Sequence, residues 1–247
     1  MDNTSNWYES WFDSPFYHIL YGNRDEEEAR RFIDVLINFL QPTQGDSFMD
    51  LACGKGRHAL AIHRHGYPVC GIDLSENSIR EARALETTGL EFHVHDMRDV
   101  FRPQGFQYIF NLFTSFGYFE HANDLYQTMD AIAAQLKPGG TLVLDYLNTR
   151  AADRFIGNGY QDKIEREGIL FHIEKKIRDQ FISKSINFTV DQKKFHFEEH
   201  IWRLDESDFT KLCDHAGLSI QTIFGDYQLG EFNPELSDRF ILIARKD

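Results

Sequence analysis

The stretch from Asp50 to Gly56 carries residue types that suit the binding of a charged small molecule. Glycines at 54 and 56 let the chain turn sharply and let a ligand touch the backbone. The helix expected after them offers free N–H groups and a partial positive charge. The spacing Gly54-x-Gly56-x-x-Ala59 also matches a relaxed dinucleotide-binding turn. The turn therefore predicts a site for an anionic ligand group without identifying the ligand.

Acidic side chains follow three successive predicted strands. Asp73 ends the second strand, where its carboxylate can accept both hydroxyls of an adenosine ribose, and Asp96-Met97 follows the third, where the pair can receive an adenine amino group and cover its ring. Asp50 lies beside the glycine turn, where it would repel a pyrophosphate but suit the ammonium of S-adenosylmethionine (SAM). The three positions together favour SAM over a dinucleotide.

The elements that must position these residues alternate regularly up to about residue 146. Apolar runs predict strands at 48–51, 69–72, 90–94, 108–113 and 141–144. Helical patterns lie between them, including a helix that starts at the acidic run 25–28 and ends before Pro42, and one opened by Ser75. This order predicts a doubly wound α/β fold whose parallel sheet carries its ligand at the carboxyl ends of the strands.

The pattern changes near residue 150. Three segments read as strands with no helix between them, and they predict an inserted antiparallel lobe: 169–177, 181–190 and 194–204. Asp205 can then cap a helix that Gly217 ends, before closing strands near 218–224 and 238–244. We therefore expect three units: an N-terminal lid segment (1–24), a cofactor-binding domain (25–150 and 205–247) and a substrate lobe (151–204).

From about residue 25 to 247 the chain resembles class I SAM-dependent methyltransferases. The resemblance is carried by residues 50–56, 71–75 and 95–97, and by the stretch 136–141, Leu-Lys-Pro-Gly-Gly-Thr. It implies a Rossmann-like seven-stranded sheet in the order 3-2-1-4-5-7-6, with strand seven antiparallel and a small antiparallel β lobe inserted after strand five. We expect the cofactor to contact Tyr17, Tyr21, Asp50, Ala52, Gly54, Gly56, Asp73, Leu74, Asp96, Met97, Asn111 and Phe113.

Within that family the chain is similar to small-molecule enzymes such as sugar-amine and glycine-type N-methyltransferases. The turn 114–118, Thr-Ser-Phe-Gly-Tyr, resembles their serine-rich turn after strand four. At 111–114 the chain reads Asn-Leu-Phe-Thr, whereas nucleic-acid amino methyltransferases have Asn-Pro-Pro-aromatic. The expected reaction is in-line transfer of a methyl group from SAM to a nitrogen or oxygen of a small-molecule acceptor, with S-adenosylhomocysteine as product.

Such a transfer does not require a catalytic triad, and the sequence displays none. Weak candidates for a catalytic role are Tyr118, His121 and Asn148, in the loops after strands four and five. The lobe adds residues that could face the acceptor: His172, His196, His200, Trp202 and Arg203. No metal site is expected, because His93 and His95 share a strand face without an acid pair beside them.

Composition limits the partners and the setting. The net charge of -13 and the pI near 5.3 disfavour nucleic acid, and three cysteines without CxxC spacing fit a reducing cytoplasm. No apolar run suggests a membrane span, so a cytoplasmic protein is expected. The sequence does not choose between a monomer and a homodimer. Two other functions remain open: a non-catalytic, regulatory SAM-binding module, and an NAD-dependent oxidoreductase that uses the same glycine turn.

Overall fold

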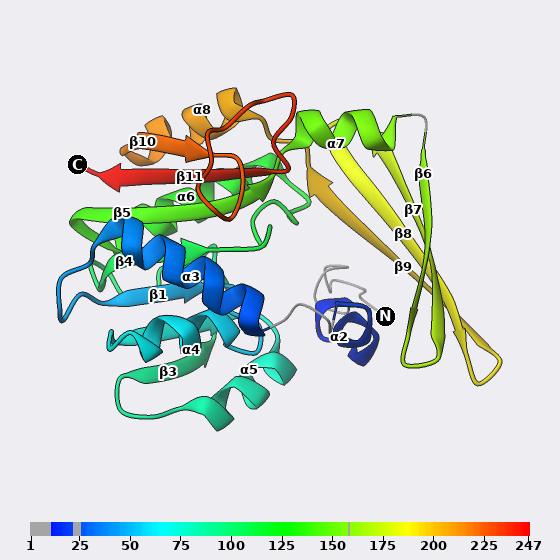
Figure 1. Cartoon of the computed structure of the whole chain (residues 1–247), viewed down its shortest axis with the longest axis horizontal. Helices are drawn as coiled ribbons and strands as arrows, with labels where there is room; N and C mark the ends of the chain where they lie inside the picture. Colours follow the sequence, from blue (N-terminus) through cyan, green and yellow to red (C-terminus); the bar gives the residue numbers. More distant parts are fainter. Residues whose placement is uncertain (1–10, 22–25, 158) are drawn as a thin grey trace.

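Two β-sheets organise the chain in the computed structural model, which describes residues 11–21, 26–157 and 159–247 (Figure 1). The parts of the predicted lid at 1–10 and 22–24 lie outside the described residues, as does Asp25 of the acidic run. In the described part of the chain, no helix is both long and apolar enough to span a membrane.

The larger sheet has seven strands in the order β10-β11-β5-β4-β1-β2-β3. Their bounds are β1 Phe48–Leu51, β2 Val69–Asp73, β3 Leu90–Val94, β4 Phe106–Asn111, β5 Leu136–Leu147, β10 Leu218–Phe224 and β11 Arg239–Lys246. β1 to β5 pair in parallel, whereas β11 runs antiparallel to both β5 and β10. The predicted order 3-2-1-4-5-7-6, with the seventh strand antiparallel, is therefore confirmed.

Helices cover both faces of this sheet. One layer consists of α3 (Glu26–Leu40), α4 (Arg57–Arg64) and α5 (Glu76–Ala82), followed by a short 3-10 turn, η1 (Arg83–Leu85). The other consists of α6 (Ala122–Gln135) and α8 (Glu206–Ala216). Each layer encloses its own apolar core, because the strands alternate buried side chains between the two faces. The predicted caps are present: Ser75 accepts the Ser78 amide hydrogen, and Asp205 forms a capping box with Asp208.

The second sheet is a four-stranded antiparallel meander that stands beyond the carboxyl ends of the parallel strands (Figure 1). It is formed by β6 (Tyr160–Arg166), β7 (Ile169–Arg178), β8 (Phe181–Val190) and β9 (Lys193–Trp202), and α7 (Thr149–Ile156) leads into it. The sequence predicted the last three strands but neither β6 nor α7. β6 is an edge strand paired only with β7, and its exposed, polar residues lack the alternation that marks a half-buried strand.

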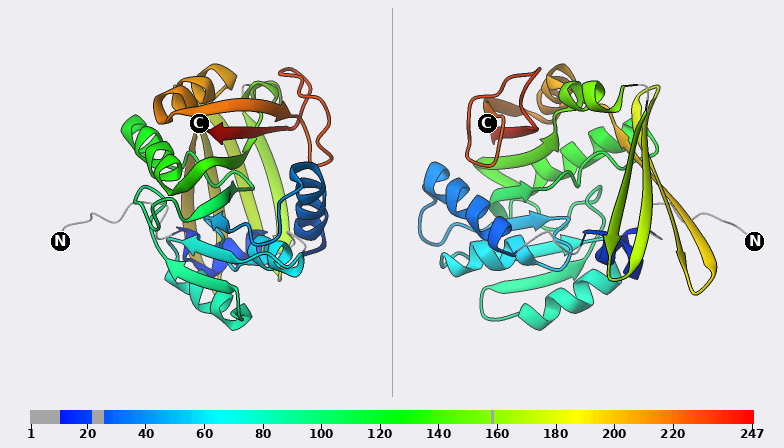
Figure 2. Two further views of the ribbon diagram at one scale, coloured as in Figure 1. Left: turned by 90° about the vertical axis from the view of Figure 1, so that its left-hand side faces the viewer. Right: turned by 45° about the vertical axis from the view of Figure 1, so that its right-hand side comes forward.

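The helix α2 (Pro15–Tyr21) lies between the strand ends of the large sheet and the inner face of the meander (Figures 1 and 2). Trp11 and Leu20 pack there against Phe171 and Phe188 of the meander, in a third apolar cluster. Residues from the start of the described chain thus fill the space that separates the two sheets, directly over the site predicted from the glycine turn.

Candidate functional site

In the turn after β1, the backbone at Gly56 has a conformation and surroundings that only glycine accommodates. Gly56 caps α4 at a φ of 82°, and a Cβ atom built on it would lie 2.6 Å from ring carbons of Phe92. Gly54 and Ala52 also have positive φ values, 54° and 62°. The chain therefore turns tightly against β3 and leaves the backbone at the start of α4 close to any ligand at the strand ends.

Asp73 and Asp50 hold this turn from two sides. Asp73 accepts hydrogen bonds from the backbone N–H of Gly54 at 2.8 Å and of Ser75 at 2.9 Å. Asp50, only 1% exposed, accepts the Ala59 amide hydrogen at 2.9 Å and so ties β1 to α4. Burial, with the nearby Asp73 charge, raises the pKa of Asp50 to about 7, and burial also raises the pKa of Asp73.

A cavity of about 680 Å³ opens at the carboxyl ends of β1 to β4, under α2. It brings together most of the residues predicted to hold the cofactor, and also Tyr118. The predicted residues that line it are Tyr17, Tyr21, Ala52, Gly54, Asp73, Leu74, Asp96, Met97, Phe113 and Tyr118. Its size is in the range of sites that enclose a complete small-molecule ligand.

Asp50, Gly56 and three further predicted residues are not among those that line the cavity. Asn111 is fully buried and donates its amide to the carbonyl of Leu51 at 2.9 Å. His121 is exposed at the start of α6. Asn148 donates its amide to the carbonyls of residues 234 and 237, at 2.9 and 2.8 Å, and so supports the loop before β11. The structure does not bring these three side chains to the strand-end site.

Asp96, at the far end of the cavity, is held by Arg98. The guanidinium donates to both carboxylate oxygens, with contacts of 2.6 and 3.1 Å. Although burial opposes it, this pairing lowers the pKa of Asp96 below its ordinary value. The Asp96 carboxylate beside Met97 is thus held in place as a hydrogen-bond acceptor.

Several cavity residues were not predicted as site residues from the sequence: Phe12, Asp13, His18, Arg57, His58, Thr114 and Ser115. Asp13 accepts hydrogen bonds from the Ser75 hydroxyl at 2.7 Å and the Asn77 amide at 3.1 Å, at the start of α5. Burial and the nearby Lys55 charge lower the pKa of His18. Arg57 and His58 follow Gly56 directly, so the position of the glycine turn could have indicated them.

Aromatic rings form one wall of the cavity. Phe12 packs edge-on against Tyr118 and against Tyr17, with ring centroids 5.0 Å apart in each case. Tyr17 lies 4.8 Å from Tyr21. These rings come from the lid segment and from the turn after β4, so the wall is complete only when the two segments lie together.

The lid segment is also fastened to the meander through a buried carboxylate. Glu199, on β9 and 6% exposed, accepts hydrogen bonds from the Trp11 indole and the Tyr21 hydroxyl, each at 2.7 Å. The Lys184 ammonium on β8 contacts the Tyr21 hydroxyl and lies 3.7 Å from the Glu199 carboxylate. Burial and the Glu199 charge raise the pKa of Tyr21 well above its ordinary value, so its hydroxyl keeps its proton.

The polar lobe residues predicted to face an acceptor do not line the cavity. His172 and His196 are exposed, and His200 contacts the Ser183 hydroxyl at 3.0 Å. Arg203 forms an ion pair with Asp153. The pairing of β8 with β9 explains this: His196 and His200 share a face of β9, while Glu199, one residue away, points to the lid.

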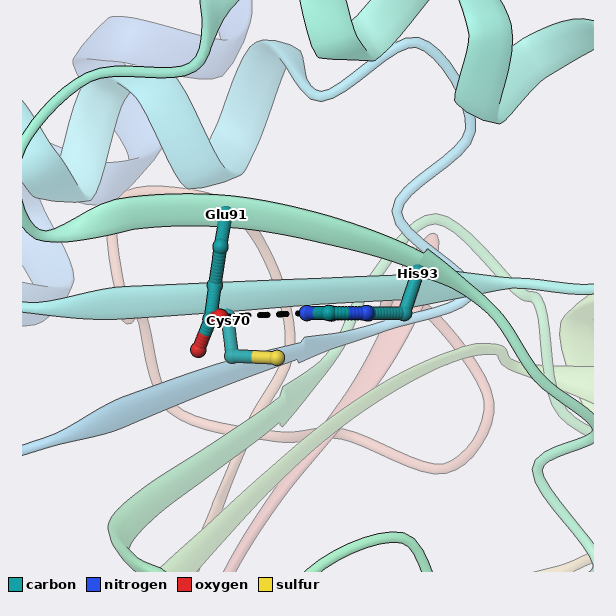
Figure 3. A group of neighbouring side chains, drawn as sticks. All are labelled: Cys70, Glu91 and His93. Atoms are coloured by element: carbon teal, nitrogen blue, oxygen red, sulfur yellow. Dashed lines mark hydrogen bonds and ion pairs between the residues drawn. The ribbon is translucent and has the colours of Figure 1, made fainter.

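One group of described residues combines three possible metal ligands: Cys70 on β2, with Glu91 and His93 on the adjacent β3 (Figure 3). Their ligand atoms lie within 4.8 Å of one another. His93 therefore does have an acid beside it, at 3.1 Å, contrary to the expectation from sequence. Glu91 is also paired with Arg102 at 2.5 Å, and burial raises the pKa of Cys70 to about 12. Because Glu91 already pairs with Arg102 and His93, we interpret this group as a cluster of ion pairs rather than as a metal site.

Comparisons with known proteins agree with this geometry. A family model described as a methyltransferase domain matches residues 24–223. One relative, the dTDP-3-amino-3,4,6-trideoxy-alpha-D-glucopyranose N,N-dimethyltransferase of Streptomyces venezuelae, is 26% identical over 220 residues, which cover 85% of this chain and 91% of the relative.

Two solved structures share the fold at 20% sequence identity. An S-adenosylmethionine-dependent methyltransferase from Clostridium acetobutylicum has a TM-score of 0.79, covering 94% of this chain and 96% of its own. A SAM-bound amino pentose methyltransferase from Micromonospora echinaspora has a TM-score of 0.72, covering 95% and 98%. Since the family model spans most of the chain and the strand-end cavity lies where the glycine turn predicts, the chain belongs to the methyltransferase-domain family and is a SAM-dependent methyltransferase.

Proposed function

We propose that this methyltransferase transfers the methyl group of SAM to the nitrogen of a small amino sugar. The observation that carries the proposal is the course of the cavity, which runs from the strand-end carboxylates to the aromatic wall beneath the lid. Phe12, Tyr17 and Tyr118 suit both a positively charged sulfonium and the apolar face of a sugar ring. A volume of about 680 Å³ accommodates a cofactor together with a small acceptor.

The cofactor assignments made from the sequence remain part of this proposal. Gly54 would lie at the methionine portion of SAM, Asp73 at the ribose hydroxyls, and Asp96 with Met97 at the adenine. All four line the cavity, in the order in which their strands lie in the sheet. Asp50, whose pKa burial raises to about 7, would act by tying the glycine turn to α4 from outside the cavity.

The protein's main contribution to catalysis would be to position the acceptor and the methyl group. The nucleophile attacks the methyl carbon as the bond from carbon to sulfur breaks, and the electron pair leaves with S-adenosylhomocysteine. Holding the reactants in line can supply effective molarities of about 10⁵ M or more. The acceptor amine must arrive without its proton, and the methylated ammonium can release its proton to solvent after the transfer.

A nitrogen acceptor demands less of the protein than an oxygen acceptor. A hydroxyl group needs a base to remove its proton during attack, whereas a neutral amine does not. Tyr118, His18 and His58 line the cavity, so the choice of nitrogen rests on this lower demand and on the relatives rather than on the lack of a base. The Streptomyces relative, whose name specifies an N,N-dimethyltransferase of an amino sugar, supports the same choice.

The division into a lid (1–24), a cofactor domain and a substrate lobe (151–204) also stays a proposal. It is supported by the hydrogen bonds of Trp11 and Tyr21 to Glu199, which join residues of the first and the last of these segments. The sequence alone also left open a regulatory module without catalysis. The room beside the aromatic wall argues for an acceptor there.

The proposal is tested by incubating the purified protein with SAM and paired sugars that differ only in an amino or a hydroxyl group, free and nucleotide-linked. We expect S-adenosylhomocysteine to form, and a methylated product to appear by mass spectrometry, only with the amino member of a pair. Turnover confined to hydroxyl members would favour O-methylation. SAM binding without turnover on any amine would favour the regulatory module.

A further inference from the structure

The turn that follows β4 has a strained backbone. Phe113 and Thr114 adopt φ values of 58° and 60°, a left-handed conformation that β-branched and aromatic residues rarely take. Both residues line the cavity. Strain of this kind persists only where the surroundings enforce it, so the contacts that hold this turn bear on the geometry of the site.

A single residue of β5 binds both strained amides. The Asp145 carboxylate accepts the Phe113 N–H at 2.7 Å, and the backbone carbonyl of Asp145 accepts the Thr114 N–H at 3.0 Å. Asp145 is fully buried and is not among the residues that line the cavity. It therefore acts on the turn without access to a ligand.

Arg239 of the neighbouring strand β11 completes the support. Its Nε donates to the Asp145 carboxylate at 2.8 Å, and its Nη2 donates to the Thr114 hydroxyl at 2.7 Å. Arg239 lies opposite Leu147 in the β5–β11 register, two residues from Asp145, so both side chains emerge on the same face of the sheet. Asp145 and Arg239 thus hold the turn through the backbone amides of Phe113 and Thr114 and through the Thr114 hydroxyl.

Aromatic stacking holds the other end of the turn. The Phe113 ring stacks on Tyr227 with centroids 5.2 Å apart, and the Arg57 guanidinium of α4 lies 4.3 Å from the centroid of the same ring. The Tyr227 hydroxyl in turn donates to the Asp145 carboxylate at 3.4 Å. Phe113 therefore contacts both a ring that is bonded to the ion pair and a side chain of α4.

We propose that Asp145 and Arg239 are positioning residues for methyl transfer, which hold the turn at Phe113 and Thr114 so that its cavity face places the acceptor against the methyl group. This inference rests on the proposed function. A displacement of about 1 Å in such a site can lower a rate by about 100-fold. The pair would therefore affect turnover strongly although neither residue lines the cavity.

The test separates positioning from simple stabilisation with the single variant Arg239→Gln and the double variant Asp145→Asn/Arg239→Gln. The single variant leaves a buried carboxylate without its cation, and we expect a lower melting temperature. The double variant removes both charges, so its melting temperature should recover. Its kcat should nevertheless stay about 10- to 100-fold below wild type, because the short glutamine amide cannot bond both residue 145 and Thr114.

Two measurements complete the experiment. The dissociation constant for S-adenosylhomocysteine should change much less than kcat, since Gly54, Asp73, Asp96 and Met97 follow other strands and only Asn111 and Phe113 of the assigned contacts lie at β4. Hydrogen exchange of the amides at 113 and 114 should be faster in the double variant. Arg102→Gln, which breaks a part-exposed ion pair with Glu91 outside the cavity lining, is the matched control and should leave kcat and exchange at the turn unchanged.

The outcomes distinguish the two proposals. If wild type methylates no amine, the proposed function fails. The hydrogen-exchange data then still test whether Asp145 and Arg239 hold the turn at 113 and 114. If the double variant regains its melting temperature together with full kcat, or if exchange at 113 and 114 equals that of wild type, the positioning role is overturned.

Discussion

Asp73 is the side chain on which the cofactor assignment depends most directly. It already accepts two backbone N–H groups, from Gly54 and Ser75, so its carboxylate is fixed at the cavity wall. Replacing it by asparagine keeps the size and removes the charge, and we expect the dissociation constant for SAM to rise roughly 10- to 100-fold. Isothermal titration calorimetry measures this. Asp99→Asn changes an exposed acid, three residues after Asp96, that does not line the cavity, and it is the control. Equal affinities in both variants would refute the ribose assignment.

The raised pKa of Asp50 predicts that the free energy of unfolding depends on pH. Its folded-state pKa of about 7 lies above the ordinary 3.8, so between these values the folded protein binds a proton that the unfolded chain does not. This contribution stabilises the fold at low pH and is lost as the pH rises toward 7. Above that pH, the buried charge opposes folding by something on the order of 4 kcal/mol.

Asp50→Asn should flatten this dependence, because an amide oxygen can still accept the Ala59 amide hydrogen but does not titrate. Denaturant unfolding of the cofactor-free protein, from about pH 5 to about pH 8, should show wild type losing stability relative to the variant. Parallel profiles would mean that Asp50 does not carry the raised pKa.

At the scale of single residues, the sequence predicted which residues lie at strand ends better than it predicted the directions in which their side chains point. Asp73 and Asp96 line the cavity because a residue that ends a parallel strand meets that edge of the sheet. Asn148 also follows a strand, yet its amide points to the loop before β11. That direction depends on a loop distant in the sequence. The same holds for Asp145 and Arg239, whose pairing needs the antiparallel register of β5 and β11.

At the scale of elements, the lid segment connects the cofactor side of the site to the meander. Asp13 caps the start of α5 through Ser75 and Asn77, while Trp11 and Tyr21 bind Glu199 on β9. These attachments hold the segment beside the cavity, so we expect their loss to speed the release of a bound cofactor.

Asp13→Ala should increase the dissociation rate of S-adenosylhomocysteine by about 10-fold, because charged hydrogen bonds to α5 are lost. Stopped-flow displacement measures the rate. Asp13→Asn keeps an acceptor at the same position and should change it less. Asp34→Ala, at a residue of α3 that pairs with His65 and does not line the cavity, should not change it. A wild-type rate in Asp13→Ala would show that the cap does not hold the lid.

Elements with strong periodicity were predicted well, and the weakly patterned ones were not. The parallel strands are buried apolar runs, and α8 carries both of its predicted end signals, Asp205 and Gly217. β6 is polar and half exposed along its length, and α7 leaves Phe155 largely exposed. Their formation depends on β7 and on the chain's return to the large sheet. Such tertiary support leaves little trace in local sequence.

At the scale of the whole molecule, one cavity borders the large sheet and the lid, and the lid is tied to the meander, so a ligand there should stabilise all three together. S-adenosylhomocysteine at about 100 times its dissociation constant should add about 2.7 kcal/mol to the free energy of unfolding. For a chain of 247 residues this corresponds to a rise of roughly 5 to 11 °C in melting temperature.

NAD at the same concentration should produce no shift, because Asp50 and Asp73 disfavour a pyrophosphate beside the glycine turn. Differential scanning fluorimetry with both ligands, and with Asp73→Asn as a binding-deficient control, makes the comparison; a rise with NAD alone would restore the oxidoreductase and reject SAM as cofactor.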